Sequence, residues 1–553
     1  MCFDYNYQKE IRKNTFLAYK GKIILPTGSG KGHICIDMIP EGIKDYGWKK
    51  IIVFSPRLIL NKQWLKKLLD KDFKYLINFV LVGSDEVTKE IRREIEHSLY
   101  KKIGTGYTPP FSTLNYNDLK EGMEKFEREG YITIVISTYH SAGVVKNSGV
   151  IFDCAFYDEA HYLPVSSYTL VQRKKDNLFV ATKIDSRRKY FLTATPKYTN
   201  CDESTGMNNE EVYGKEICNI SPREMIENGY VLKPFLAIAS INKDVEDIDI
   251  INDSDKVLSL NGNADENNFN IKAKAIFKAH KESKQWLKEE SISPDKIGAK
   301  TLVVCNGSGD LRGTLESREF RIFREENPNI KIYTISCDTG IEINGVIYTR
   351  VDSRGKEEFL DDLKSLSDEE EAIILHVDMI GVGIDVPGIT GVFFFRNCNL
   401  EKFLQNLGRG SRLHPEDRKR LESGELKVND YKNYIKPGYI IFISYMSEGK
   451  ENLFVEKREW ILKLRSDYCF DGSSLINGEN LKPAPTPIED ENGVLRTLGG
   501  ITEEYEAFIQ IEEMNEEIAK KEADIKDFIN EVRELEEKND EQEIIDLETE
   551  LFS

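Results

Sequence analysis

The 553-residue sequence lacks the marks of secreted, metal-binding and membrane-spanning proteins. Its 9 cysteines are odd in number and form neither a Cys-x-x-Cys pair nor a metal-ligand cluster, which argues against a disulfide framework and a structural zinc site. No uninterrupted apolar run reaches the roughly 18 residues of a membrane span. The first residues, Met1 to Asp4, lack the basic and then apolar order of a secretory signal. We therefore expect reduced thiols, no membrane partner and a location in the cytoplasm, or in the host cytoplasm if a phage or virus encodes the chain.

Basic residues are fewer than acidic ones, but their distribution matters more than the total. The chain has 76 basic and 95 acidic residues, which gives a net charge of −19. Residues 502–553 contain 5 basic and 20 acidic residues, so the remaining 501 residues carry a net charge of only −4. A nearly neutral body can carry a local basic groove, and the acidic total therefore does not exclude a nucleic-acid partner.

Two series of apolar, β-branched runs predict two α/β domains. Continuous rather than alternating apolar runs are typical of parallel strands that helices cover on both faces. Proline-rich residues 483–487 indicate a linker. Heptad spacing from Ile511 to Leu535 predicts a long helix that packs on its own chain or on a partner. The predicted segments are a first α/β domain at 1–215, a connector at 216–269, a second α/β domain at 270–447, an accessory segment or linker at 448–501 and an acidic amphipathic helical tail at 502–553.

A glycine-rich loop follows the first apolar run. The stretch from Leu25 to His33 reads LPTGSGKGH and lies between a predicted strand and a predicted helix. Glycines let backbone N–H groups turn toward phosphate oxygens, the helix N-terminus favours anions, and Lys31 would reach the β- and γ-phosphates. Gly32 stands where a Ser or Thr hydroxyl usually contacts Mg²⁺, so either a water takes that position or magnesium-dependent turnover is weakened. The predicted phosphate-binding residues are Thr27, Gly28, Ser29, Gly30, Lys31 and Gly32.

A pair of carboxylates ends another apolar run, 127 residues beyond Lys31. The sequence there is Asp158-Glu159-Ala160-His161. Asp158 can hold a metal ion, usually through its water, while Glu159 orients and activates the attacking water. A surface charge pair is the alternative, which the position after an apolar strand disfavours.

Further motifs follow in a consistent order. They are SPR at 55–57, STYH at 137–140, LTATP at 192–196, IGVGIDVPG at 380–388 and QNLGRGSR at 405–412. Together with the loop and the carboxylate pair, they make residues 5–447 resemble superfamily 2 helicases and translocases with a DEAH-type motif II. The resemblance implies two tandem RecA-like parallel-sheet domains, here with a C-terminal helical extension, and ATP and Mg²⁺ as cofactors. It also implies nucleotide contacts at Gln8, Gly383, Asp385 and Gln405, nucleic-acid contacts at Pro56, Arg57 and Thr138, and coupling roles for His161, Thr193 and Thr195.

Two arginines of the last motif are candidate catalytic residues. Arg409 and Arg412 are three residues apart on a predicted helix and therefore share one face. Guanidinium groups bind phosphate bidentately and stabilise the charge of a transferring phosphoryl group. On the second domain they would complete the site when the cleft closes over ATP, which couples hydrolysis to closure. The alternative for each arginine is a surface ion pair.

The resemblance implies an ATP-hydrolysing enzyme that moves on or unwinds nucleic acid. The sequences of LTATP at 192–196, which resembles motif III of this superfamily, and of QNLGRGSR at 405–412, which resembles motif VI, are more similar to phage-type and restriction-type DNA motors than to RNA-directed enzymes. This similarity favours DNA and leaves RNA open. The alternatives are the motor subunit of a restriction or defence nuclease and a weakly hydrolysing ATP-dependent clamp, which Gly32 would favour. Strand polarity, the choice between unwinding and duplex translocation, and the oligomeric state stay open.

Overall fold

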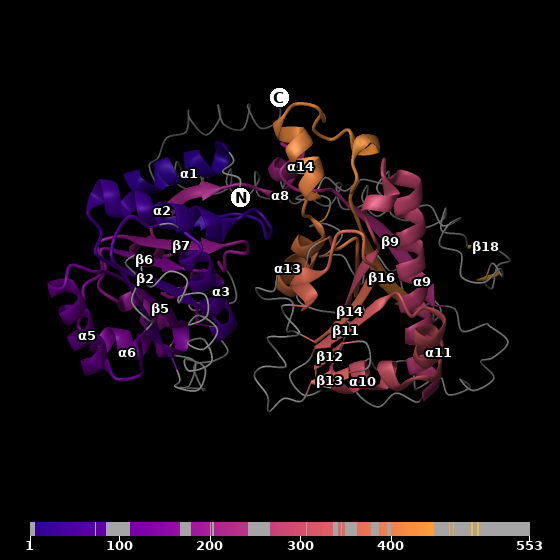
Figure 1. The fold of residues 1–553 in the computed structure, drawn as a ribbon, viewed down its shortest axis with the longest axis horizontal. Coiled ribbons are helices and arrows are strands. Elements are labelled where there is room, and N and C mark those ends of the chain that lie inside the picture. Colours follow the sequence, from indigo (N-terminus) through magenta and orange to yellow (C-terminus); the bar gives the residue numbers. More distant parts are fainter. Residues whose placement is uncertain are drawn as a thin grey trace, which may run out of the picture.

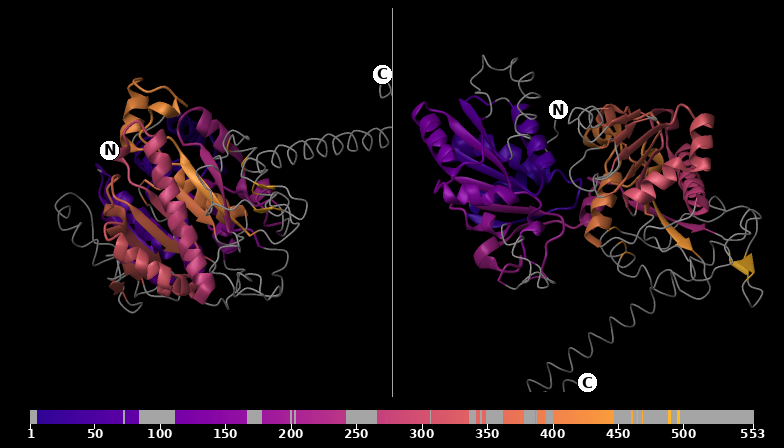
Figure 2. Two further views of the ribbon diagram at one scale, coloured as in Figure 1. Left: turned by 90° about the vertical axis from the view of Figure 1, so that its right-hand side faces the viewer. Right: turned by 90° about the horizontal axis from the view of Figure 1, so that it is seen from below.

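A computed structural model of the chain has two α/β lobes that lie side by side, also when viewed from below (Figure 1, Figure 2). Within the described residues, no helix is long and apolar enough to cross a membrane. The predicted helix of 502–553 lies outside these residues. The structure describes residues 6–71, 73–83, 111–165, 178–198, 201, 204–241, 266–305, 307–335, 341–343, 346–348, 362–377, 386, 388–394, 400–446, 460, 464, 468, 488–489 and 495–496.

The first lobe is built on a sheet of eight parallel strands in the order β4-β3-β5-β2-β6-β7-β1-β8. The strands are β1 (Lys20–Ile24), β2 (Lys50–Ser55), β3 (Ile77–Val82), β4 (Phe111–Thr113), β5 (Ile132–Thr138), β6 (Cys154–Tyr157), β7 (Lys189–Thr193) and β8 (Lys215–Asn219). The helices are α1 (Asn6–Leu17), α2 (Lys31–Tyr46), α3 (Leu58–Leu69), α5 (Tyr116–Arg128), α6 (Ala142–Asn147) and α7 (Glu210–Tyr213).

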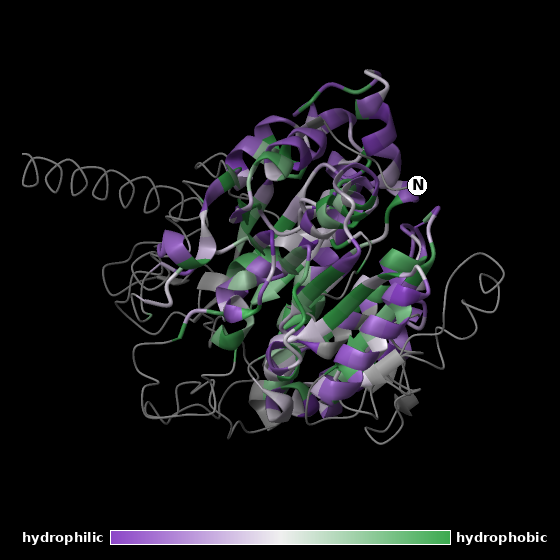
Figure 3. Ribbon diagram, turned by 90° about the vertical axis from the view of Figure 1, so that its left-hand side faces the viewer, coloured by the Kyte–Doolittle hydropathy of each residue, from purple (hydrophilic) through white to green (hydrophobic). Residues whose placement is uncertain are grey.

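Helices cover both faces of this sheet, as its continuous apolar strands predict. Ile51 and Val53 of β2 share one buried cluster with residues of α1, α2 and α3. The intervening Ile52 and Phe54 belong to a second cluster, which includes α5 and α6. The strands accordingly stand out as hydrophobic between largely hydrophilic helices (Figure 3).

The second lobe repeats this plan with a sheet in the order β13-β12-β11-β14-β10-β15-β16-β9, parallel except at β12 and β13. The strands are β9 (Pro234–Ile241), β10 (Lys300–Val304), β11 (Lys331–Ile335), β12 (Ile341–Ile343), β13 (Val346–Tyr348), β14 (Ala372–His376), β15 (Gly391–Phe394) and β16 (Tyr439–Met446). The helices are α8 (Pro222–Glu227), α9 (Glu266–Glu290), α10 (Ser308–Glu316), α11 (Arg318–Glu326), α13 (Leu400–Gly410) and α14 (Pro415–Glu422). A separate hairpin pairs β17 (Ile488–Glu489) with β18 (Leu495–Arg496).

The two sheets extend into the stretch that the sequence assigned to the connector, 216–269. Strand β8 joins the edge of the first sheet beside β1, and β9 joins the second sheet beside β16. Strand β8 is only partly buried, and its sequence KEICN carries no continuous apolar run. Edge strands of this kind are hard to recognise because only their sheet partner defines them.

Candidate active site

The loops that carry the predicted motifs follow the carboxyl ends of neighbouring parallel strands, where open α/β sheets bind their ligands. The Gly-rich loop follows β1 and leads into α2. Gly28 and Gly30 have φ angles of +90° and +83°, a region that favours glycine. The backbone N–H of Leu25 donates to the Thr193 carbonyl at 3.0 Å. This bond ties the start of the loop to the strand that carries motif III.

Lys31 is buried in this loop, with 8% of its surface exposed. Its Nζ donates to the carbonyls of Leu25 at 2.9 Å and Pro26 at 3.2 Å. Burial lowers the pKa of Lys31, whereas the charges of Glu159 and Asp158 raise it. The amino group therefore lies between the loop backbone and the acidic pair, where a phosphate chain would need a positive charge.

Asp158 and Glu159 follow β6 directly, and neighbouring elements hold Asp158 in place. Trp64 of α3 donates its indole N–H to Asp158 Oδ2 at 2.8 Å, and the Tyr139 hydroxyl donates to the Asp158 carbonyl at 2.6 Å. Burial and the Glu159 charge raise the pKa of Asp158 to about 6, against the Trp64 hydrogen bond and the Lys31 charge. Glu159 has a φ of +51°, a rare backbone conformation for a side chain and one that clusters at functional sites.

His161 connects this acidic pair to motif III. Its Nδ1 lies 2.9 Å from Thr193 Oγ1 and 3.5 Å from Glu159 Oε2. Thr193 Oγ1 also accepts the N–H of Thr195 at 3.1 Å. The structure thus brings together all three residues that the sequence predicted to couple the two motifs.

Gln8 lies on α1 against the Gly-rich loop. Its Nε2 donates to the Ser29 carbonyl at 3.3 Å, and the Tyr7 hydroxyl donates to the same carbonyl. A Cβ on Gly30 would come 2.6 Å from Gln8 Nε2 at the end of a flexible side chain, and the φ of +83° is what favours glycine here. The ring of Tyr7 also packs on Tyr230 between the two lobes, with centroids 4.6 Å apart.

The second lobe reaches the Gly-rich loop through α13. A Cβ on Gly408 would come 2.3 Å from Thr27 Cβ, so the end of α13 touches the loop closely. A Cβ on Gly28 would lie 3.1 Å from the Gly408 carbonyl and 4.0 Å from Arg412 Cγ. Figure 1 shows α13 on the side of its lobe that faces the first lobe.

Arg409 and Gln405 are both buried on α13. Burial lowers the pKa of Arg409 to about 10, and the charge of Glu159 in the other lobe opposes this shift. Burial and the Arg418 charge lower the pKa of Arg412 to about 10 as well. Both guanidinium groups remain charged at neutral pH and stand at the loop that holds Lys31.

The predicted nucleic-acid contacts lie at the ends of β2 and β5. Pro56 is buried. Arg57 is partly buried, occupies the N-cap position of α3 and has an extended backbone. The Ser55 hydroxyl donates to the Arg57 carbonyl at 3.0 Å. Thr138 is buried, and its hydroxyl donates to Ser141 Oγ at 3.1 Å.

Two predicted nucleotide contacts, Gly383 and Asp385, lie outside the described residues. Sequence reasoning missed the contact between Trp64 and Asp158, although Gly32 offered a signal. A Cβ on Gly32 would lie 3.9 Å from the Trp64 ring, so the indole stands beside the position of the missing hydroxyl. The indole N–H donates its hydrogen bond to the Asp158 carboxylate.

The residues present fit a magnesium nucleotide. The described residues include no cluster of three or more His, Cys, Asp or Glu side chains that could hold a metal ion. Mg²⁺ needs no such cluster, because it is usually bound by one or two carboxylates together with phosphates and waters. Asp158 offers a partly buried carboxylate, and Lys31, Arg409 and Arg412 offer positive charge for the phosphates.

Comparison with known proteins shows what this chain is similar to. A family model described as the res subunit of Type III restriction enzymes matches residues 4–198, which include most of the first lobe. The Type ISP restriction-modification enzyme LlaBIII bound to DNA has the same fold with a TM-score of 0.55 and 16% identity, over 85% of this chain and 30% of that chain. The chain is thus similar to this family model over its first lobe and shares the fold of the LlaBIII structure.

Other solved structures are similar to this chain at lower TM-scores. A nuclease-deletion mutant of the Type ISP enzyme LlaGI with a DNA substrate mimic has a TM-score of 0.48 and 15% identity, over 83% of this chain and 28% of that chain. The DEAD-box helicase Mss116 bound to ssRNA and UDP-BeF has a TM-score of 0.41 and 15% identity, over 85% of this chain and 78% of that chain. The chain spans less than a third of the two restriction-modification enzymes. A search of curated proteins gave no match.

Proposed function

We propose that this chain hydrolyses ATP between its two lobes and uses their closure to move along nucleic acid, with DNA as the expected track. The observation that carries the proposal is the contact of α13 with the Gly-rich loop. It brings Arg409 and Arg412 of one lobe to Lys31 of the other. A site shared in this way is complete only when the lobes are closed, so its chemistry and their movement are coupled.

The roles of the residues follow from their charges and positions. Glu159 orients a water molecule and accepts its proton while the water oxygen bonds to the γ-phosphorus, and the bond to the bridging oxygen of ADP breaks. Lys31 and Arg409 stabilise the negative charge on the phosphates. Asp158 would hold Mg²⁺, which neutralises phosphate charge when bound.

Several observations favour DNA and a restriction-type assembly. The family model is named after a restriction enzyme, and the structure with the highest TM-score given above is of a restriction enzyme bound to DNA. The sequences of motifs III and VI also favour a DNA motor of restriction type. We therefore propose a cytoplasmic DNA motor that works alone or as the motor part of a restriction or defence complex.

The test is ATP hydrolysis with Mg²⁺ at one stated salt concentration, with no polymer or with single-stranded DNA, duplex DNA, branched DNA or RNA. Strong stimulation by DNA supports the proposal, and the DNA form that stimulates most identifies the track. Stimulation by RNA alone would overturn the choice of DNA. ATP binding without hydrolysis under any condition would favour the clamp, for which Gly32 is the argument.

A further inference from the structure

The last turn of α13 packs tightly on both of its sides. Gly408 faces Thr27 of the other lobe, as described above. A Cβ on Gly410 would come 2.3 Å from the ring of Tyr439, the first residue of β16. Arg409 lies between these two contacts, so its position depends on how the end of this helix is held.

A buried lysine forms hydrogen bonds to the C-terminal end of α13 and to the turn that follows it. Lys436 is 1% exposed and lies three residues before Tyr439, the first residue of β16. Its Nζ donates to the Gly410 carbonyl at 2.7 Å and to the Arg412 carbonyl at 2.8 Å. Carbonyls at a helix C-terminus have no hydrogen-bond donor within the helix. A lysine near them can donate these hydrogen bonds, and its positive charge interacts favourably with the helix dipole.

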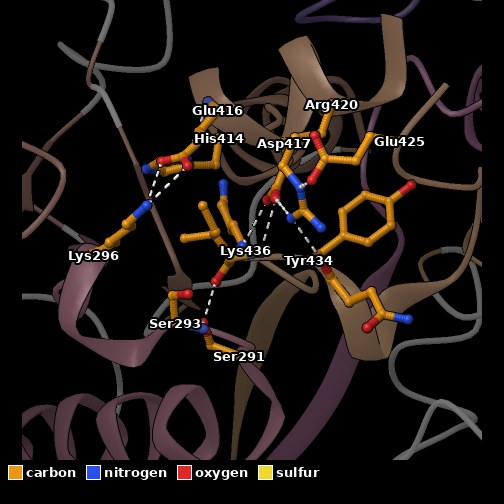
Figure 4. Close-up of polar contacts among 12 residues, drawn as sticks. Ser291, Ser293, Lys296, His414, Glu416, Asp417, Arg420, Glu425, Tyr434 and Lys436 are labelled. Carbon is orange, nitrogen blue, oxygen red and sulfur yellow. Dashed lines mark hydrogen bonds and ion pairs between the residues drawn. The ribbon is translucent and has the colours of Figure 1, made fainter. Parts of the chain in front are cut away.

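A second buried group fixes the lysine itself. Asp417 of α14 is fully buried and accepts the backbone N–H groups of Ile435 and Lys436, each at 2.9 Å. Arg420 adds a longer contact of 3.4 Å to the same carboxylate. Figure 4 shows Asp417 between Arg420 and the backbone of Lys436. The link therefore runs from α14 through the start of β16 to the turn after α13.

We propose that Lys436 is a positioning residue for Arg409 and Arg412. Its two hydrogen bonds go to the carbonyls on either side of Ser411. They therefore hold the backbone of the turn between the two arginines in one conformation. The amino group keeps two N–H donors when it loses its proton, so both bonds persist in either state. The inference rests on the proposed function, because the arginines matter only if they act on a nucleotide.

The experiment compares Lys436→Met with Lys300→Met. Lys300 is a second buried lysine of this lobe, and its Nζ donates to the Asp368 carbonyl at 2.9 Å rather than to a carbonyl of the turn. We expect Lys436→Met to lower kcat by about 100-fold, since misplacing catalytic groups by 1 Å costs this much, and also to raise KM for ATP, because misplaced arginines bind the γ-phosphate less well. The thermal midpoints of the two variants are measured to show that they are destabilised to a similar extent. Lys300→Met should keep kcat within about threefold of wild type.

A double-mutant cycle with Arg409→Ala separates positioning from general destabilisation. If Lys436 acts through the arginine, Lys436→Met should lower kcat much less in the Arg409→Ala background than in wild type. Equal losses in both backgrounds, or an equal loss in Lys300→Met, would overturn the proposal. If Lys436→Met does not fold, Asp417→Asn takes its place, because an amide oxygen can replace only one of the two carboxylate acceptors.

A binding measurement keeps this inference separate from the proposed function. In the Glu159→Gln background, Lys436→Met should weaken the binding of ATP but not of ADP, because the arginines are placed to reach the γ-phosphate. This readout needs no turnover. A wild-type chain without ATPase activity would end the proposed motor function, whereas equal binding of ATP by both proteins would end the role of Lys436.

Discussion

At the scale of single residues, the site depends on Glu159 for the proton transfer. Glu159→Gln keeps the shape of the side chain but removes the base, so we expect turnover to fall by at least about 100-fold while ATP still binds. Steady-state hydrolysis and equilibrium ATP binding are the two measurements. Hydrolysis at the wild-type rate would remove Glu159 from its role.

The indole of Trp64 donates to Asp158 and lies beside Gly32, where this type of loop usually has a hydroxyl. A hydrogen bond to a charged group contributes about 1.5–3 kcal/mol, so Trp64→Phe should lower kcat by about tenfold or more. Gly32→Thr should restore part of this loss in the Trp64→Phe protein, because a hydroxyl returns beside Asp158. In wild type the same substitution should change little, since the space beside Gly32 allows an ordinary contact with the ring. A large gain from Gly32→Thr in wild type would instead show that the natural loop is attenuated.

Lys436 should also make stability depend on pH. Its pKa lies at about 7, below the ordinary 10.5, because of burial and of the Arg412 and Lys300 charges, which outweigh Asp368 and Asp417. Between these two values the unfolded chain binds a proton that the folded chain does not, so the free energy of unfolding rises with pH. Lys436→Met should flatten this rise by on the order of 1 kcal/mol per pH unit in chemical denaturation. Parallel pH profiles for the two proteins would contradict this expectation.

At the scale of elements, two glycines of α13 make a matched pair. Gly408→Ala places a methyl group against Thr27 of the other lobe, and Gly410→Ala places one against Tyr439 of its own lobe. Overpacking within a lobe costs about 1–3 kcal/mol, so Gly410→Ala should lower the thermal midpoint. Gly408→Ala should instead leave the thermal midpoint close to that of wild type and lower kcat, because the added methyl group opposes closure of the two lobes. A Gly408→Ala protein with full activity would show that turnover does not need this contact.

Elements were predictable where one short stretch determines them. The buried strands β2 and β5 have continuous apolar sequences, and the Gly-rich loop has its own conformational signature. Strands β8 and β9 were not predicted, because their pairing with β1 and β16 depends on residues far away in the chain. The same holds for the indole of Trp64 and the amino group of Lys436, whose partners are 94 and 24–26 residues away. Motifs therefore predicted residues that the structure brings together around the Gly-rich loop, but not the residues that support them.

At the scale of the whole molecule, the charge is divided between a nearly neutral body and an acidic tail. Removing 502–553 changes the net charge from −19 to −4 without touching any residue of the proposed site. We expect residues 1–501 to keep the wild-type kcat and to bind DNA more tightly at about 0.05 M salt, because long-range repulsion of phosphates falls with the net charge. The gain should nearly vanish at about 0.5 M salt, where the screening length is only a few ångströms. Equal affinities at low salt would mean that the tail does not repel DNA, and a folded but inactive truncation would mean that the tail takes part in catalysis.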